Sequence, residues 1–127
     1  MKILIVDDSS YVRDVLHTSL KTINSSLVIE DESTYKGGLR HYCILEPEIV
    51  ILDIALPDES GIKLLQKIKE INRKTAVIIF SNYATDEFIK NSLENGADYF
   101  FDKSKDYLKM LKMLKNFTGF NKFELIN

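Results

Sequence analysis

The sequence lacks the features that identify disulfide-linked, nucleic-acid-binding and membrane-spanning proteins. Its single cysteine, Cys43, excludes a disulfide within the chain, and we expect this thiol to be a small buried apolar residue in a reducing compartment. A net charge of -2 provides no basic face for nucleic acid. No apolar run approaches the roughly 18 residues of a membrane helix. These absences predict a cytoplasmic globular domain, without membrane insertion or direct contact with nucleic acid.

The 127 residues are 45% hydrophobic, which is enough for one buried core. Short, continuous apolar runs are typical of strands whose two faces are both covered, as in parallel sheets. Such runs occur at 2–6, 26–30, 48–53, 75–80 and 99–101. Helix-period segments lie between or after them, at 10–24, 35–45, 60–72, 85–95 and 104–116. This alternation predicts an α/β fold, a (βα)5 doubly wound parallel sheet with right-handed crossovers.

The last of these helices is expected to begin at Ser104. Its apolar side would carry Leu108, Leu111 and Leu114, which recur at helical spacing.

Polar residues follow four of the predicted strands. Asp7 and Asp8 come after the first, Asp53 after the third, Ser81 after the fourth and Lys103 after the fifth. Ligands of doubly wound sheets bind beyond the carboxyl ends of the strands. In the flavodoxin-like strand order 2-1-3-4-5, the first and third strands are neighbours, so the three aspartates would meet there.

Three clustered carboxylates repel one another unless a cation shares them. Mg²⁺ takes hard oxygen ligands and uses one or two carboxylates directly. A lysine and a hydroxyl nearby suit a phosphoryl group, whose charge spreads over its oxygens. Asp53, at the centre, could then be a nucleophile that forms an aspartyl phosphate.

The segments "LIVDDS", "PEIVILDIALPDESGIKLL", "VIIFSN" and "GADYFFDKS" stand in an order and at spacings that resemble a response-regulator receiver domain. The resemblance covers about residues 1–115. Such domains are the phosphoacceptor modules of two-component signalling and phosphorelays. The resemblance implies a switch rather than a metabolic enzyme. It would accept a phosphoryl group from a sensor histidine kinase or a histidine phosphotransfer protein, in a Mg²⁺-dependent reaction, and change its binding to a downstream protein target.

The resemblance also implies a role for each acid. Asp53 matches the phosphoacceptor, and Asp7 and Asp8 match the pair that holds Mg²⁺, with Asp8 the more direct ligand. Asp53 itself and the backbone carbonyl of Ala55 would complete the protein ligands of the metal.

Two further positions would bind the phosphoryl group, and one more would respond to it. Ser81 and Lys103 match the phosphoryl-binding hydroxyl and lysine. Ser81 and Phe100 match the residues that switch conformation. Pro57 and Gly61 match the loop that follows the acceptor strand.

The chain departs from the family pattern near these residues. Ser104 follows Lys103, where many members have a proline that is often cis; a cis bond before serine would cost about 3–4 kcal/mol. Asn82 stands where a small residue is usual. Ala55 and Tyr83 lack an acid or amide that could orient an attacking water, so we expect slow self-dephosphorylation.

We expect a receiver domain over residues 1–116 and a C-terminal tail at 117–127, with no output domain. The sequence leaves open a phosphorylation-dependent homodimer. One alternative is a receiver-like adaptor that binds partners without phosphorylation. Another is a Mg²⁺-dependent phosphatase with an aspartyl nucleophile, which would want a second acid where Ala55 stands. A flavin-binding protein of this topology would need a glycine- and hydroxyl-rich loop in place of the two aspartates.

Overall fold

Five parallel strands form one sheet in the order β2-β1-β3-β4-β5, as predicted. The computed structural model describes residues 1–118. The strands are β1 (Lys2–Val6), β2 (Val28–Glu32), β3 (Ile49–Leu52), β4 (Ala76–Ser81) and β5 (Tyr99–Asp102). Each neighbouring pair is parallel, so all five carboxyl ends lie at one edge of the sheet.

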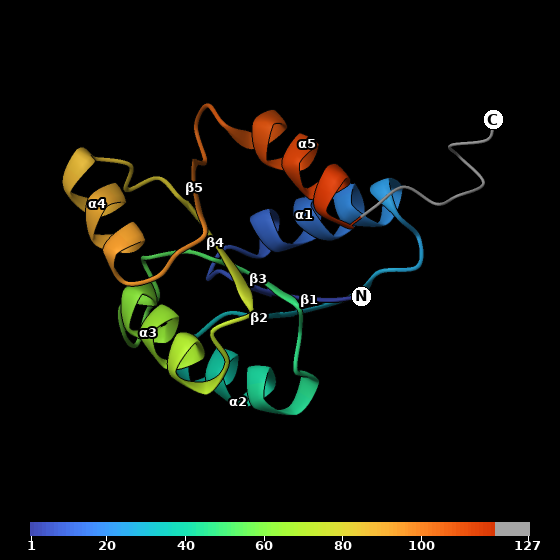
Figure 1. The fold of residues 1–127 in the computed structure, drawn as a ribbon. Helices are drawn as coiled ribbons and strands as arrows, with labels where there is room; N and C mark the ends of the chain where they lie inside the picture. Colours follow the sequence, from blue (N-terminus) through green and yellow to red (C-terminus); the bar gives the residue numbers. More distant parts are fainter. Residues whose placement is uncertain (119–127) are drawn as a thin grey trace.

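A helix follows each strand. The helices are α1 (Ser10–Ile23), α2 (Tyr35–Leu45), α3 (Gly61–Ile71), α4 (Asp86–Glu94) and α5 (Tyr107–Thr118). In Figure 1, α1 and α5 lie on one side of the sheet and α2 and α3 on the other, with α4 beyond α3. The predicted doubly wound α/β architecture is confirmed.

Alternate residues of the central strands enter two separate apolar cores. Ile3 and Ile5 pack with the residues of α1 and α5, whereas Leu4 and Val6 pack with those of α2 and α3. All four side chains are fully buried. Both faces of β1 are therefore covered, which explains its unbroken apolar run.

Hydroxyl residues cap the first four helices. Each side-chain oxygen accepts a hydrogen bond from a backbone N–H of the first turn, which would otherwise have no partner. The caps are Ser9, Thr34, Ser60 and Thr85. Three of them directly follow the loops at the carboxyl edge that bear the candidate site, so they fix where those loops end.

The second strand lies two residues later than predicted. The expected range was 26–30, but β2 runs from Val28 to Glu32 and includes three acidic residues. The buried Leu27 belongs to the preceding turn, and the N–H of Val28 bonds the carbonyl of Met1 at 3.0 Å. Because β2 is an edge strand with one open side, it accepts polar residues that an apolar-run criterion does not expect.

The fifth helix begins at Tyr107 rather than at Ser104. Tyr107, Met110 and Leu114 face the core. Leu108 was expected on the apolar side and is instead 76% exposed, since it lies one position away from that stripe. The helix includes Phe117 and Thr118, the former predicted as the start of a tail; residues 119–127 of that tail lie outside the described residues.

Cys43 is exposed, so the prediction of a buried thiol was wrong. The buried positions of α2 are Gly38, Tyr42 and Leu45, spaced by four and three residues, and Cys43 falls off that stripe. Within residues 1–118, no helix has the length and apolar character needed to cross a membrane.

Candidate functional site

The three predicted aspartates meet at the carboxyl edge of the sheet. Asp7 follows β1 and Asp53 follows β3, and the N–H of Asp53 bonds the carbonyl of Val6 at 3.0 Å, which extends the pairing of the two strands. One carboxylate oxygen from each of Asp7, Asp8 and Asp53 lies within 4.8 Å of the others. Asp7 and Asp53 are buried, whereas Asp8 is exposed. The cluster therefore has two inner carboxylates and one that faces solvent.

Lys103 joins the two inner carboxylates. Its Nζ lies 2.6 Å from Oδ2 of Asp7 and 2.8 Å from Oδ2 of Asp53, and its side chain is 10% exposed. Its backbone N–H donates to the carbonyl of Ser81 at 3.0 Å, which ties the end of β5 to β4. Burial opposes the charge of the ammonium, but the hydrogen bonds that it donates to Asp53 and Asp7 outweigh this effect and raise the pKa of Lys103.

Every polar group of Asp7 has a partner. Its N–H donates to the carbonyl of Glu32 at 3.0 Å, and its carbonyl accepts from Nη1 of Arg13 at 2.7 Å. Its Oδ1 accepts the N–H of Ser9 at 2.9 Å. Burial raises the pKa of Asp7 above its usual value, although the hydrogen bonds from Lys103 and Ser9 act in the opposite direction. A buried carboxylate with a raised pKa is a mark of functional sites.

The loop after Asp53 folds back tightly on the end of β3. The N–H of Ala55 lies 3.4 Å from Oδ1 of Asp53, and the N–H of Gly61 donates to the carbonyl of Ile54 at 2.7 Å. A Cβ atom added at Gly61 would lie 2.0 Å from the carbonyl oxygen of Asp53. Only glycine permits this approach, which explains the glycine that sequence comparison singled out at this position.

Asp58 links the same loop to a different helix. Its two carboxylate oxygens accept the backbone N–H groups of Tyr35 and Lys36, at 2.8 and 3.0 Å, in the first turn of α2. These hydrogen bonds lower the pKa of Asp58. The loop that follows the candidate phosphoacceptor is therefore attached to the start of α2.

Ser81 ends β4, which pairs with β3, and Phe100 lies on β5, the strand beyond β4. Ser81 is fully buried, and its Oγ accepts the N–H of Tyr83 at 3.2 Å. Phe100 is partly buried and packs against the core on the side of α2 and α3. Tyr83 is 51% exposed, and its ring meets that of Phe88 edge to face. The candidate hydroxyl is in place at the site edge, with its oxygen bonded to the following loop.

The backbone after Lys103 needs no proline. Every peptide bond within residues 1–118 is trans, the one between Lys103 and Ser104 included. Oδ1 of Asp102 accepts both the N–H and the hydroxyl of Ser104, at 2.8 and 2.6 Å. These bonds hold the turn that carries Lys103.

The donor set suits a hard divalent cation. Three carboxylates and one ammonium leave two negative charges at the cluster, which one divalent ion neutralises. All the available donors are oxygens, the ligands that Mg²⁺ prefers over nitrogen or sulfur donors. The residues present therefore fit the metal that the sequence predicted.

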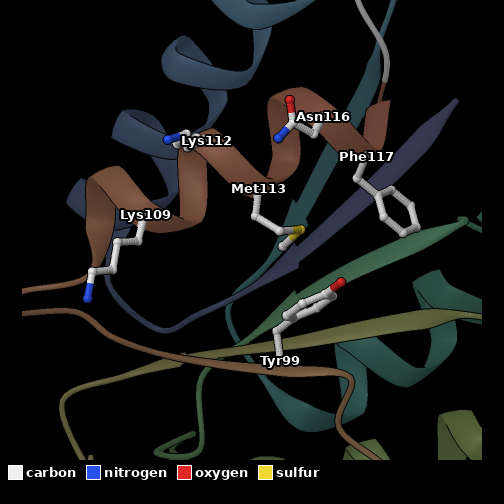
Figure 2. Close-up of a pocket in the computed structure, with 6 residues that line it drawn as sticks. All are labelled: Tyr99, Lys109, Lys112, Met113, Asn116 and Phe117. Atoms are coloured by element: carbon white, nitrogen blue, oxygen red, sulfur yellow. The ribbon is translucent and has the colours of Figure 1, made fainter.

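Two grooves lie near α5, one at each end of the sheet. One, of about 460 Å³, lies beside the cluster and is lined by Tyr11, Phe80 and Lys103 among others. The other, of about 600 Å³, lies at the amino end of β5, where Met113 and Phe117 extend from α5 toward Tyr99 (Figure 2). Of these two grooves, the first is lined by Lys103, which contacts the inner carboxylates.

Sequence reasoning missed two residues that hold the site, Arg13 and Asp58. Arg13 could have been noticed in the sequence, because it stands in the first turn of a helix among the apolar residues Val12, Val15 and Leu16. A lone cation beside an apolar stripe often has an acidic partner. Asp58 gave no such signal, since its partners are backbone N–H groups 22 and 23 residues away.

The family model described as the response regulator receiver domain matches residues 3–115. The chain belongs to that family. The receiver domain is 33% identical over 96 residues to the transcriptional regulatory protein YdfI of Bacillus subtilis, which covers 76% of this chain and 45% of that protein. It is 27% identical over 115 residues to the chemotaxis protein CheY of Listeria monocytogenes, which covers 91% of this chain and 96% of CheY.

Solved structures show the same fold. The receiver domain superposes with a TM-score of 0.81 and 28% identity on a chain of the CheX–CheY–BeF3–Mg complex from Borrelia burgdorferi, over 94% of this chain and 90% of that one. It spans less than half of the length of several relatives it matches, among them YdfI and the probable C4-dicarboxylate response regulator DctR of Bacillus subtilis. The family shown places the chain in two-component signalling.

Proposed function

We propose that this receiver domain accepts a phosphoryl group on Asp53 from a phosphohistidine, and that it does so in the cytoplasm as a switch rather than as a metabolic enzyme. The donor is a sensor histidine kinase or a histidine phosphotransfer protein. The observation that carries the proposal is the position of Asp53: buried, 2.8 Å from the Lys103 ammonium, and with an oxygen within 4.8 Å of two other carboxylates.

The transfer forms one bond and breaks one. An oxygen of Asp53 attacks the phosphorus, and the bond from phosphorus to the donor imidazole nitrogen breaks, so that its electron pair stays on the imidazole. Lys103 holds Oδ2 of Asp53, so Oδ1 is the freer nucleophile. The ammonium of Lys103 and the hydroxyl of Ser81 then bind the transferred oxygens, whose charge they offset.

Asp7, Asp8, Asp53 and the carbonyl of Ala55 are the residues that would hold Mg²⁺. When bound, the ion offsets the repulsion between the phosphoryl oxygens and the acidic cluster. A related CheY, 28% identical to this chain, is described in complex with BeF3 and Mg, which supports the same chemistry here. Lys103 already neutralises part of the charge on the inner pair and leaves Asp8 open to solvent.

Phosphorylation would alter the surface that partners bind. We propose that Ser81 exchanges its bond from Tyr83 for one to the phosphoryl group, and that Phe100 moves into the space this opens. The phosphoryl group shifts this equilibrium only by the contacts that it makes better in one state than in the other. The altered face binds a downstream protein target, or a second copy of the chain.

Acetyl phosphate with Mg²⁺ tests the proposal directly. The protein should gain the mass of one phosphoryl group, and the gain should be absent in Asp53→Asn and without Mg²⁺. The matched control is Asp98→Asn, a change of the same kind on an exposed carboxylate far from the cluster. An unphosphorylated wild-type protein that still binds its partners would favour the adaptor, and turnover of phosphomonoesters would favour the phosphatase.

A further inference from the structure

Arg13, in the first turn of α1, connects the two strand ends that lie beside the acidic cluster. Its Nη1 donates to the carbonyl oxygen of Asp7 at 2.7 Å, and its Nε lies 3.3 Å from Oδ2 of Asp31 on β2. The side chain is 19% exposed. A guanidinium held in this way has two fixed N–H directions, one toward the backbone and one toward its carboxylate anchor.

The carbonyl that Arg13 binds belongs to the peptide unit between Asp7 and Asp8. That unit is planar, so fixing its oxygen fixes the orientation of the whole plane, and with it the direction in which Asp8 leaves the strand. On the other side of Asp7, the N–H is held by the carbonyl of Glu32. Within residues 1–118, no hydrogen bond or ion pair holds the exposed carboxylate of Asp8 itself.

We propose that Arg13 is a positioning residue of the metal site, which directs Asp8 toward the cation through the carbonyl of Asp7 and the anchor Asp31. The inference deepens the proposed function and rests on it. Arg13 touches neither the cation nor the phosphoryl group in this role. Groups that orient metal ligands from behind commonly change metal affinity by about 10–100-fold when they are removed.

Charge and position predict opposite results for the loss of Arg13. A positive charge near a cation site repels the cation, so its removal by itself would tighten the binding of Mg²⁺. Loss of the hydrogen bond to Asp7 frees the peptide plane and the direction of Asp8, and so weakens that binding. The sign of the change therefore separates a positioning role from a purely electrostatic one.

Calorimetric titration of the full chain with Mg²⁺ tests the proposal. We expect the Kd to rise about tenfold in Arg13→Met and by several-fold in Arg13→Lys, which retains the charge but not the two N–H directions. The control is Arg40→Met, the same substitution at an exposed site on α2, which should leave the Kd within about twofold of wild type. Thermal unfolding confirms that each variant is folded at the temperature of the titration.

A second measurement needs no metal. In ¹⁵N-labelled, metal-free protein, the amide signal of Asp8 should shift in Arg13→Met, because its peptide carbonyl loses a charged hydrogen-bond donor, and should not shift in Arg40→Met. Unchanged or tighter Mg²⁺ binding in both Arg13 variants overturns the inference and leaves the proposed function standing. A wild-type protein that binds Mg²⁺ but takes no phosphoryl group from acetyl phosphate overturns the proposed function instead.

Discussion

Lys103 is the residue on which the charge balance of the site depends. It is the ammonium that lies between Asp7 and Asp53, both buried. Removing one partner from a buried set of charges costs more than the net worth of the interaction, since the remaining charges lose their compensation. The three charged residues therefore compensate one another when all are present, and the loss of any one of them destabilises the fold.

Lys103→Ala should lower the free energy of unfolding by about 3 kcal/mol at pH 7.5. Burial already raises the pKa of Asp7, and loss of Lys103 removes an interaction that lowers it, so the folded-state pKa rises further. A raised pKa in the folded state means that stability falls as pH increases through it. The difference in unfolding free energy between Lys103→Ala and wild type should therefore shrink toward pH 5, as measured by urea denaturation. The control, Lys112→Ala at an exposed position on α5, should show almost no difference from wild type.

Gly61 is the second residue whose substitution should disturb the site. Gly61→Ala would bring a Cβ atom to 2.0 Å from the carbonyl oxygen of Asp53, a backbone atom that cannot move aside. We expect a loss of about 3 kcal/mol in urea denaturation and a lower rate of labelling by acetyl phosphate.

Gly37→Ala is the matched control for that change. The Cβ there meets Oε2 at the end of the Glu32 side chain at 2.6 Å, and a side-chain end can shift by a few tenths of an ångström more easily than a backbone carbonyl. A loss at Gly37 as large as at Gly61 would contradict the explanation from backbone contact.

The lifetime of the phosphoryl group should depend on Ala55 and Tyr83. Neither side chain can orient a water molecule for attack on an aspartyl phosphate. Phosphorylated wild-type protein should therefore lose its label slowly with Mg²⁺ present, and Ala55→Asn should lose it about tenfold faster. The decay is measured by mass spectrometry after removal of acetyl phosphate, and a half-life shorter in wild type than in the variant would contradict the prediction.

At the scale of elements, α2 is joined to β2 by a histidine between two carboxylates. Nδ1 of His41 lies 3.0 Å from Oε1 of Glu32, and Nε2 lies 2.8 Å from Oε1 of Glu30. Only the protonated ring can donate from both nitrogens. Burial alone would lower the pKa of His41, but the two glutamates raise it above the usual 6.5.

This arrangement predicts a pH-dependent contribution to stability. Because the folded-state pKa is the higher one, the contribution is complete below pH 6.5 and is lost as pH rises through the raised pKa. We expect His41→Gln to be less stable than wild type by about 0.5–1 kcal/mol at pH 6 and by much less at pH 9. Urea titrations at the two pH values measure it, with His17→Gln as the control; a constant difference would contradict the prediction.

The type and order of the elements could be predicted because the apolar runs are continuous and segments of helical period alternate with them. The alternation predicts a parallel sheet, whereas the meeting of the three aspartates depended on assuming the flavodoxin-like order 2-1-3-4-5, which the structure confirms. Errors occurred where tertiary context decides: β2 accepts Glu30 and Glu32 because it lies at the sheet edge and His41 pairs with them. The start of α5 was also mispredicted. Ser104 resembles a helix cap, but the helix begins at Tyr107, and the residues that face the core differ accordingly.

The candidate site was predicted residue by residue, whereas its supports were not. Asp7, Asp53 and Lys103 stand directly after strands, and that place in the sequence is visible. Asp58 acts on backbone N–H groups, and a backbone partner has no sequence signature. Arg13 was visible as a lone cation beside an apolar stripe, but its bond to the carbonyl of Asp7 was not. Contacts of this kind become visible only once the chain is folded.

At the scale of the whole molecule, the site opens toward a groove between α1 and α5. Tyr11 and Lys103 both line this groove, and Tyr11 is 76% exposed. Under the proposed function, a protein donor that brings a phosphohistidine to Asp53 would cover this surface, whereas a small donor would not need to.

Tyr11→Ala should therefore slow phosphotransfer from a protein donor about tenfold or more, because it removes a large exposed aromatic contact. Labelling by acetyl phosphate should stay within twofold of wild type. The two rates are measured side by side on one preparation, with Leu108→Ala, also 76% exposed but on α5, as the control. Equal slowing with both donors would place Tyr11 in the chemistry rather than at the partner surface.

The bidentate link from Asp58 to the first turn of α2 has a mechanical consequence. Any displacement of the segment between Asp53 and α3 must either pull the beginning of α2 with it or break both hydrogen bonds. Under the proposed function, phosphorylation of Asp53 would therefore affect the start of α2 as well as β4 and β5. Because α2 neighbours β1 and β2, at the opposite edge of the sheet from β5, this route would reach a different edge of the domain from Phe100.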